Sequence, residues 1–362
     1  MSKAYIEPIP TDPNSFNWKY LIVSSGHEYR YIDQNEHAKD VVLCLHGFPD
    51  LAFGWRYQIV ELVRRGYRVI APDLLGYGGT SKPTEIEPYT FFCMSTSVRE
   101  ILDHLKVNKV VLVGHDWGAP LSGRFLLYFP ERIRAWVTIC APPNPGPKPG
   151  AGLVDLPTAI RKNIPHFGYQ LYFMSEASGK ELTRWAKTFL LVVYCHMARR
   201  LSSPEARKVA ASAAGRKPSY VLEGVFRGRL MESKDLLEYA KVDDPETEYY
   251  ISEFRRGGLM GPVNWYKTRV LNHSDDLAYN VPDTFPKNIP SLYIQATEDE
   301  ALPPRLVSES QLDERFPGRN LKVIQIKGAN HWLLQDPQYR DKFTAELCNW
   351  IDKQVKVFKP KL

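Results

Sequence analysis

Apolar residues are arranged along the chain in two patterns, short continuous runs and longer stretches with helical spacing. Six runs rich in β-branched residues predict strands buried on both faces, because they do not alternate with polar residues. These runs are residues 41–45, 68–72, 109–113, 135–140, 291–296 and 321–326. Helical spacing lies between them, as in residues 55–65, 97–105 and 120–128. Connections of this length predict βαβ units and a mostly parallel sheet flanked by helices.

Two further elements are predicted at the ends of the chain. Residues 20–23 and 28–32 are predicted to form an antiparallel hairpin at one edge of the sheet. Near the other end, Phe343, Leu347 and Ile351 have the amphipathic spacing of a last helix.

The strand runs are interrupted once, over residues 145–284. This segment opens in a stretch rich in proline and glycine and continues with helical patterns and many aromatic residues. Such a break between strands of one sheet predicts an inserted, mainly helical cap (lid) domain. We therefore expect an α/β core made of residues 1–144 and 285–362, with the cap between its two parts.

Composition excludes several classes of protein. With 362 residues, 44% of them hydrophobic, the chain can form a sizeable core, and no apolar run approaches the roughly 18 residues of a membrane span. The net charge of +6 is spread among interleaved acids, which argues against nucleic-acid binding. The 5 cysteines form no C-x-x-C pair, so no disulfide framework or metal site is expected. They are Cys44, Cys93, Cys140, Cys195 and Cys348.

The ends of the chain bear on its location. The first twelve residues contain prolines and acids where a signal peptide would be apolar, so we expect a soluble, cytoplasmic protein. The C-terminal Pro360-Lys361-Leu362 partly matches the peroxisomal S-K-L signal, which keeps a peroxisomal location open.

The strongest signal for chemistry follows the run at residues 109–113. The sequence there is Gly114-His115-Asp116-Trp117-Gly118-Ala119. Glycines two positions before and after Asp116 are what a nucleophile elbow needs, since a Cβ at either place would clash in so sharp a turn. Such an elbow exposes its central residue at the carboxyl edge of the sheet. The pattern favours Asp116 as a nucleophile, with a plain helix cap as the alternative.

A second motif, His46-Gly47-Phe48-Pro49, follows the strand run at residues 41–45. A turn there can bring the N–H of Phe48 to the same point as the N–H of Trp117. Two N–H donors at one point form an oxyanion hole. The alternative is an ordinary loop containing glycine and proline.

A histidine and a carboxylate follow the last two strand runs. His331 comes after the final run, and this place favours it over the other histidines. Three adjacent acids, Glu298, Asp299 and Glu300, follow the preceding run, and the sequence alone does not choose among them. Nucleophile, acid and base then occur in the chain order of an α/β-hydrolase.

Together these motifs resemble the epoxide hydrolase group of the α/β-hydrolases over nearly the whole chain. The oxyanion and nucleophile motifs both match, although Ala119 stands where many relatives have glycine. The resemblance implies an α/β-hydrolase fold with a helical cap and neither cofactor nor metal. It assigns Asp116 as nucleophile, His331 as base and Asp299 as the carboxylate that orients His331.

The resemblance also assigns two tyrosines in the predicted cap. Residues 166–173 resemble a first lid motif, which assigns Tyr169 and not Tyr172. Residues 264–266 resemble a second, which assigns Tyr266. A phenol can donate a hydrogen bond to the oxygen of an opening epoxide. Without the family pattern these would be two of 20 tyrosines.

The implied activity is hydrolysis of a small, apolar epoxide to a vicinal diol, for example in detoxification. The side chains of His46, Trp265 and Trp332, with Trp117, are expected to line the substrate pocket. The sequence predicts neither the particular epoxide nor the oligomeric state.

Two other activities share parts of this pattern. A haloalkane dehalogenase shares the aspartate elbow, but Phe48 and the lid tyrosines argue against it. A non-catalytic, ligand-binding relative would not need the full set of Asp116, His331 and a carboxylate.

Overall fold

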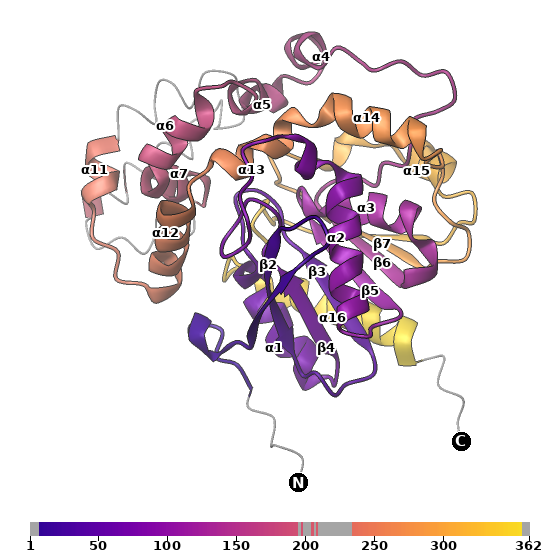
Figure 1. The fold of residues 1–362 in the computed structure, drawn as a ribbon, viewed down its shortest axis with the longest axis horizontal. Helices are drawn as coiled ribbons and strands as arrows, with labels where there is room; N and C mark the ends of the chain where they lie inside the picture. The colour runs from indigo at the N-terminus through magenta and orange to yellow at the C-terminus, as the bar shows by residue number, and fades with distance from the viewer. Residues whose placement is uncertain (1–6, 195–196, 198–203, 206–207, 209–233, 357–362) are drawn as a thin grey trace. The chain divides into compact units, whose positions relative to one another are not determined.

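The computed structural model describes residues 7–194, 197, 204–205, 208 and 234–356 (Figure 1). Cys195 and the C-terminal tripeptide, two subjects of the sequence analysis, lie outside the described residues. Contacts between residues divide the chain into two compact units. The first comprises Met1–Leu74, Thr90–Ala151 and Leu271–Leu362, and the second Leu75–Tyr89 and Gly152–Val270.

The first unit is built on an eight-stranded sheet with strand order β1-β2-β4-β3-β5-β6-β7-β8. Pairs β1–β2 and β2–β4 are antiparallel, and every other pair is parallel. The strands are β1 (Trp18–Ile22), β2 (Glu28–Gln34), β3 (Val41–Leu45), β4 (Arg68–Pro72), β5 (Val110–His115), β6 (Ile133–Ile139), β7 (Ser291–Ala296) and β8 (Leu321–Ile326). The mostly parallel sheet and the edge hairpin are therefore confirmed.

One prediction about the sheet is wrong. Strand β8 was expected to be buried on both faces, but only Ile326 of its six residues is buried, and Val323 is 40% exposed. The reason is its position, because β8 is an edge strand that pairs only with β7. Strands β3 to β7, which have neighbours on both sides, are almost entirely buried.

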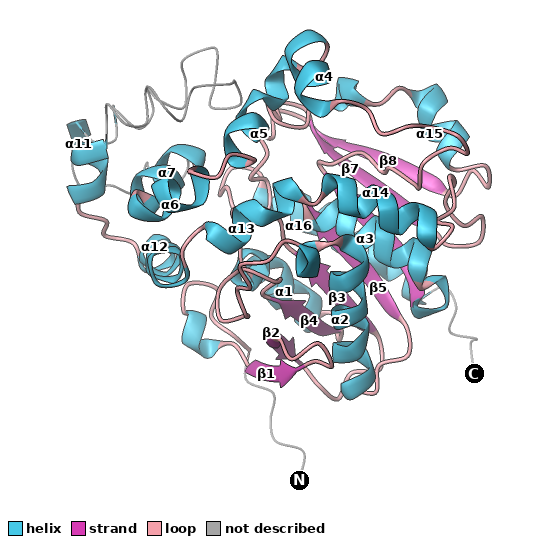
Figure 2. Ribbon diagram, turned by 45° about the horizontal axis from the view of Figure 1, so that its top comes forward, coloured by secondary structure: helices cyan, strands magenta, loops and turns pink. Residues whose placement is uncertain are grey.

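Helices pack on this sheet in two pairs, α1 with α16 and α2 with α3 (Figure 2). The α-helices are α1 (Arg56–Arg64), α2 (Phe91–His104), α3 (Gly118–Tyr128), α14 (Arg269–Ala278), α15 (Glu309–Arg315) and α16 (Arg340–Lys356). Short 3-10 helices span Pro13–Ser15, Ala52–Trp55, Pro130–Arg132 and Pro304–Leu306. The predicted helices at residues 55–65, 97–105 and 120–128 correspond to α1, α2 and α3. Helix α2 begins earlier than predicted, where Thr90 caps it by accepting from the N–H of Cys93.

The second unit is helical in the part that the structure describes. Its α-helices are α4 (Leu156–Lys162), α5 (Gly168–Phe173), α6 (Ser178–Arg184), α7 (Ala186–Val193), α11 (Lys234–Tyr239), α12 (Pro245–Gly257) and α13 (Met260–Asn264). Its 3-10 helices span Glu87–Tyr89, Pro165–Phe167 and Trp265–Lys267. Helix α12 packs against α7, and α13 packs against α6. Among the described residues of the whole chain, no helix is long and apolar enough to cross a membrane.

Two segments fall in a different unit from the one that the strand pattern suggested. Residues 75–89, expected in the core, belong to the second unit because Gly76 and Gly261 approach so closely that a side chain on either would overlap the other's backbone. Residues 271–284, expected in the cap, belong to the first unit, where Asp276 forms a bidentate ion pair with Arg124. Neither contact is visible in hydrophobic spacing.

Candidate active site

The turn after β5 has the geometry of a nucleophile elbow. Asp116 adopts a left-handed backbone conformation, with φ of 51°, and α3 begins two residues later. A Cβ on Gly114 would overlap the carbonyl of Gly118, and a Cβ on Gly118 would overlap the carbonyl of Leu45. Only glycine fits at these two positions, so the chain reverses direction and presents the carboxylate at the carboxyl edge of the sheet.

The loop after β3 approaches the same carboxylate. The backbone N–H of Phe48 donates a hydrogen bond of 2.7 Å to Oδ1 of Asp116. Gly47 permits this approach, because a Cβ there would overlap the Asp116 side chain. Trp117, the other predicted donor, follows Asp116 directly and is the N-cap residue of α3.

His331 and Asp299 complete a chain of polar contacts to Asp116. Nδ1 of His331 lies 2.7 Å from Oδ2 of Asp299, and Nε2 lies 3.4 Å from Oδ2 of Asp116. The other oxygen of Asp299 accepts the backbone N–H groups of Ala301 and Leu302 at 2.9 and 2.8 Å. The structure thus selects Asp299 from the three adjacent acids as the partner of His331, while Glu298 and Glu300 are exposed.

The two charges of this pair stabilise each other in a buried place. Burial alone would lower the pKa of His331, but the nearby carboxylates of Asp299 and Asp116 raise that pKa well above its ordinary value. Burial alone would raise the pKa of Asp299, yet His331 and hydrogen bonds to the carboxylate lower it. The two carboxylates therefore favour the protonated form of the His331 ring, which lies between them.

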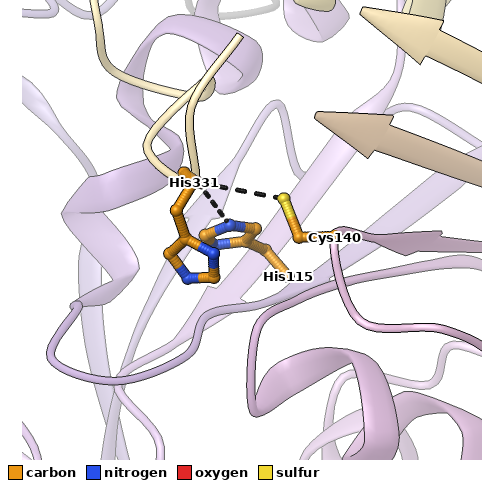
Figure 3. Close-up of side chains that lie close together, drawn as sticks. All are labelled: His115, Cys140 and His331. Carbon is orange, nitrogen blue, oxygen red and sulfur yellow. Dashed lines mark hydrogen bonds between the residues drawn. The ribbon is translucent and has the colours of Figure 1, made fainter. Parts of the chain in front are cut away.

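Two residues that the sequence analysis did not single out hold the backbone of His331. Nε2 of His115 donates to the carbonyl of His331 at 3.0 Å, and Sγ of Cys140 lies 3.9 Å from the same oxygen (Figure 3). Cys140 follows β6 in a left-handed conformation, with φ of 63°. The sequence could have indicated these two residues through their position, because both lie at the carboxyl ends of neighbouring strands.

These three residues form the one cluster of possible metal ligands among the described residues. Their chemistry does not suit a metal. Burial, with the charge of Asp299 nearby, raises the pKa of Cys140 to about 12, whereas metal binding needs the thiolate. Nε2 of His115 is used by the His331 carbonyl. His331 is likewise engaged by Asp299.

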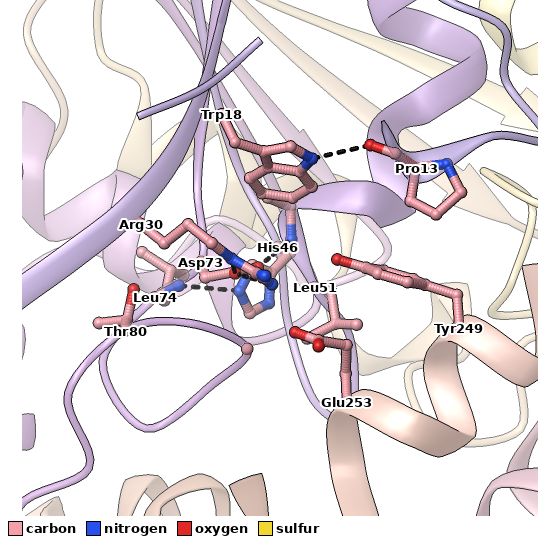
Figure 4. Close-up of polar contacts among 12 residues, drawn as sticks. Pro13, Trp18, Arg30, His46, Leu51, Asp73, Leu74, Thr80, Tyr249 and Glu253 are labelled. Carbon is pink, nitrogen blue, oxygen red and sulfur yellow. Dashed lines mark hydrogen bonds and ion pairs between the residues drawn. The ribbon is translucent and has the colours of Figure 1, made fainter. Parts of the chain in front are cut away.

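His46 has a different place from the predicted one. It is fully buried; its Nδ1 donates to the carbonyl of Gly47, and its Nε2 accepts the N–H of Leu74, both at 2.9 Å. Both ring nitrogens are thus used by the backbone, so His46 braces the loop that carries Phe48 and does not line a pocket. Figure 4 shows Asp73 beside this brace, in an ion pair with Arg30.

The two assigned tyrosines lie together in the second unit. The rings of Tyr169 and Tyr266 meet edge to face, with centroids 6.2 Å apart, and the ring of Phe173 packs against both. Tyr172, which the family pattern did not assign, donates its hydroxyl to Glu181 at 2.8 Å. The structure therefore brings Tyr169 next to Tyr266.

The predicted pocket tryptophans are packed in the unit to which each belongs. In the second unit, Trp265 is 2% exposed and donates its ring N–H to the carbonyl of Leu75. In the first, Trp332 is 3% exposed and meets the His331 ring edge to face. Trp117 packs near Phe91, with ring centroids 6.2 Å apart. Their contact with a substrate stays a prediction.

The fold and the elbow define an α/β-hydrolase. A family model described as alpha/beta hydrolase fold matches residues 40–337. Epoxide hydrolase 3 of Siraitia grosvenorii is 47% identical over 332 residues, which cover 86% of this chain and 92% of that protein. The crystal structure of epoxide hydrolase A from Mycobacterium thermoresistibile, 25% identical, matches with a TM-score of 0.69 over 93% of this chain and 98% of that one. The chain belongs to the epoxide hydrolase family.

Some relatives in this family are longer. Bifunctional epoxide hydrolase 2 of Mus musculus is 29% identical over 359 residues, which are 96% of this chain. The chain spans only 58% of the length of that protein.

Proposed function

We propose that the protein hydrolyses an epoxide to a vicinal diol through an ester on Asp116. The observation that carries the proposal is the carboxylate of Asp116 on a nucleophile elbow, held by the N–H of Phe48 on one oxygen and facing His331 with the other. Membership of the epoxide hydrolase family supports the same reaction. A carboxylate suits this task, because its attack on saturated carbon gives an ester that water can cleave.

In the first step Oδ2 of Asp116 attacks an epoxide carbon. Oδ1 stays with the N–H of Phe48, so the carboxylate keeps its orientation while the carbon–oxygen bond of the ring breaks. The oxygen that leaves the carbon takes a proton from Tyr169 or Tyr266, and the other phenol donates a hydrogen bond to it. Their adjacency supports this shared role.

In the second step water cleaves the ester. Esterification removes the negative charge of Asp116, one of the two carboxylates that raise the pKa of His331. That pKa then falls, so the proton of His331 is released to the phenolate that the first step left on the tyrosine, and the neutral ring, oriented by Asp299, can act as a base. His331 takes a proton from water, and the resulting hydroxide attacks the ester carbon while the N–H groups of Phe48 and Trp117 stabilise the oxyanion. The diol leaves with the proton from His331, and the acid formed on Asp116 passes its own proton to His331, which restores the starting state.

The substrate that suits these groups is a small, apolar epoxide. The aromatic side chains of residues 145–284, with Trp265 among them, are proposed to act as a cap that excludes water, and Trp332 and Trp117 would line the pocket from the core. Water exclusion strengthens the hydrogen bonds on which both steps depend. Neither step requires a cofactor.

The test is a single turnover of a simple aryl epoxide in oxygen-18 water, with enzyme in excess. Because water attacks the ester carbon, the heavy oxygen should appear in the peptide that contains Asp116, and the first diol should carry only ordinary oxygen. Peptide and diol masses measure both. Heavy oxygen in the first diol with none in the peptide would show direct attack of water on the epoxide and would overturn the ester mechanism.

A second arm separates the alternatives. If neither diol nor label forms, the same assay with a haloalkane tests the dehalogenase, through released halide. Binding of the epoxide without turnover of either substrate would instead indicate a non-catalytic relative.

A further inference from the structure

A cavity of about 580 Å³ lies at the amino edge of the central strands, in the first unit. Its lining includes residues at the beginning of β3 and β4, the loop before β5, and Arg134 of β6. Because these strands are parallel, their amino ends lie at the edge of the sheet opposite to Asp116, which follows the carboxyl end of β5. The cavity is therefore separate from the candidate active site.

Two arginines in the lining are fixed by ion pairs. Arg68 is nearly buried and makes two hydrogen bonds of 2.7 Å to the carboxylate of Asp33. Arg134 pairs with Asp40 at 2.7 Å and donates to the carbonyl of Val355 near the end of α16. The charges of Asp33 and Asp40 are thus balanced by arginines. In addition, Arg134 donates a hydrogen bond to a backbone carbonyl in the last turn of α16.

Three lysines in the same lining add positive charge that Asp33 and Asp40 do not balance. Lys39, Lys106 and Lys109 are exposed, and among the described residues none of them makes an ion pair. Asp40 is the only acid in the lining and is already paired with Arg134. The cavity therefore combines guanidinium groups held by ion pairs with three exposed ammonium groups, which is a suitable environment for an anion with several oxygens.

We propose that this cavity binds the phosphate group of a small solute, such as inorganic phosphate or a phosphate monoester. Arginines that are held in place lose little conformational freedom on binding, and lysines can close on an anion from two loops. The volume lies in the range of small-molecule pockets, and the concave form favours a small solute over an extended polyanion. The site does not depend on the epoxide chemistry.

Inorganic phosphate is the probe, titrated into the full chain by calorimetry, with chloride used to keep the ionic strength constant. Saturable binding of one phosphate is expected. The triple variant Lys39→Gln, Lys106→Gln and Lys109→Gln should weaken that binding by about tenfold or more, because three charges near the anion are removed. A thermal melt without phosphate checks that the variant is folded.

A second basic cavity in the first unit supplies the matched control. It is lined by Lys287 and Lys322, at the beginning of β7 and β8, with Arg319 beside them. The double variant Lys287→Gln, Lys322→Gln should change the affinity less than about twofold. An equal loss of phosphate affinity in both variants would mean that phosphate is attracted by the overall positive charge and not by this cavity, which would overturn the proposal. Binding only to vesicles that contain phosphatidic acid, without saturable binding of free phosphate, would also overturn it.

Discussion

The two groups of candidate site residues are held in place by different forces. In the first unit, hydrogen bonds and opposite charges join Asp116, His331 and Asp299, and the last two are buried. In the second unit, Tyr169 and Tyr266 are positioned by ring packing with each other and with Phe173. A change in the first group should therefore alter protonation and stability as well as rate. A hydroxyl removed from the second should alter the rate while the ring packing is kept.

The largest effect is expected from Asp116→Asn. An amide is a poor nucleophile, so ester formation should stop and diol formation should fall by at least ~10⁴-fold. Asparagine tolerates the left-handed backbone at this position, so the fold should persist. Diol formation is measured beside the intact mass, which shows that the amide has not hydrolysed. Turnover above about one hundredth of the original rate with the amide intact would exclude Asp116 as the nucleophile.

A slightly smaller effect is expected from His331→Gln. The first step does not need the base, so one equivalent of ester should form and persist, while turnover falls about 10³- to 10⁴-fold. The mass of the Asp116 peptide, increased by that of the epoxide, measures the ester. Glu298→Gln is the matched control, because this exposed acid next to Asp299 should leave turnover unchanged. Loss of activity without accumulated ester would assign His331 to the first step.

The first group could be predicted from sequence because local geometry restricts its residue types. Gly114 and Gly118 are required where backbone atoms nearly touch, and this requirement remains visible in the sequence. His331 and Asp299 follow buried strands, so the order of elements indicated their edge of the sheet. The choice of Asp299 over its neighbours needed the family pattern, and the structure gives the physical reason in its contact with His331.

What could not be predicted depends on contacts between distant segments. An apolar run does not reveal whether its strand has one neighbour or two, so the exposure of β8 was missed. The role of His46 depends on the N–H of Leu74, 28 positions away. The tyrosine pair was assigned only through the family's two lid motifs, because the ring packing around Tyr169 and Tyr266 is a contact between distant segments that the residues by themselves do not reveal.

The hydroxyl of the second group is tested by Tyr169→Phe and Tyr266→Phe. Each ring should keep its packing, while loss of a donor to the epoxide oxygen should slow ester formation by about 10²-fold. Tyr172→Phe, in the same helix as Tyr169, is the control: it loses the hydrogen bond to Glu181, costs about 1 kcal/mol of stability and leaves the rate unchanged. Pre-steady-state ester formation and urea unfolding measure the two quantities. Equal rate losses in all three variants would mean that the packing, and not the hydroxyl, matters.

The smallest effect concerns pH and the stability of the first group. The raised pKa of His331 gives a contribution to the free energy of unfolding that is complete below its unfolded value of about 6.5 and is lost as pH rises through the folded pKa. The lowered pKa of Asp299 gives a contribution that is present above about pH 4 and is lost as pH falls through the folded pKa. The stability that His331→Gln removes should therefore be greatest between about pH 4 and 6.5.

At alkaline pH, the difference in the free energy of unfolding between the original protein and His331→Gln should shrink. Urea unfolding of both proteins across this range measures it, and His104→Gln, which changes an exposed histidine, should show no such trend. If the difference instead grew with rising pH, the carboxylates would not be stabilising an imidazolium. The neutral ring would then be the form that the folded state favours, and esterification of Asp116 would no longer be needed to make His331 a base.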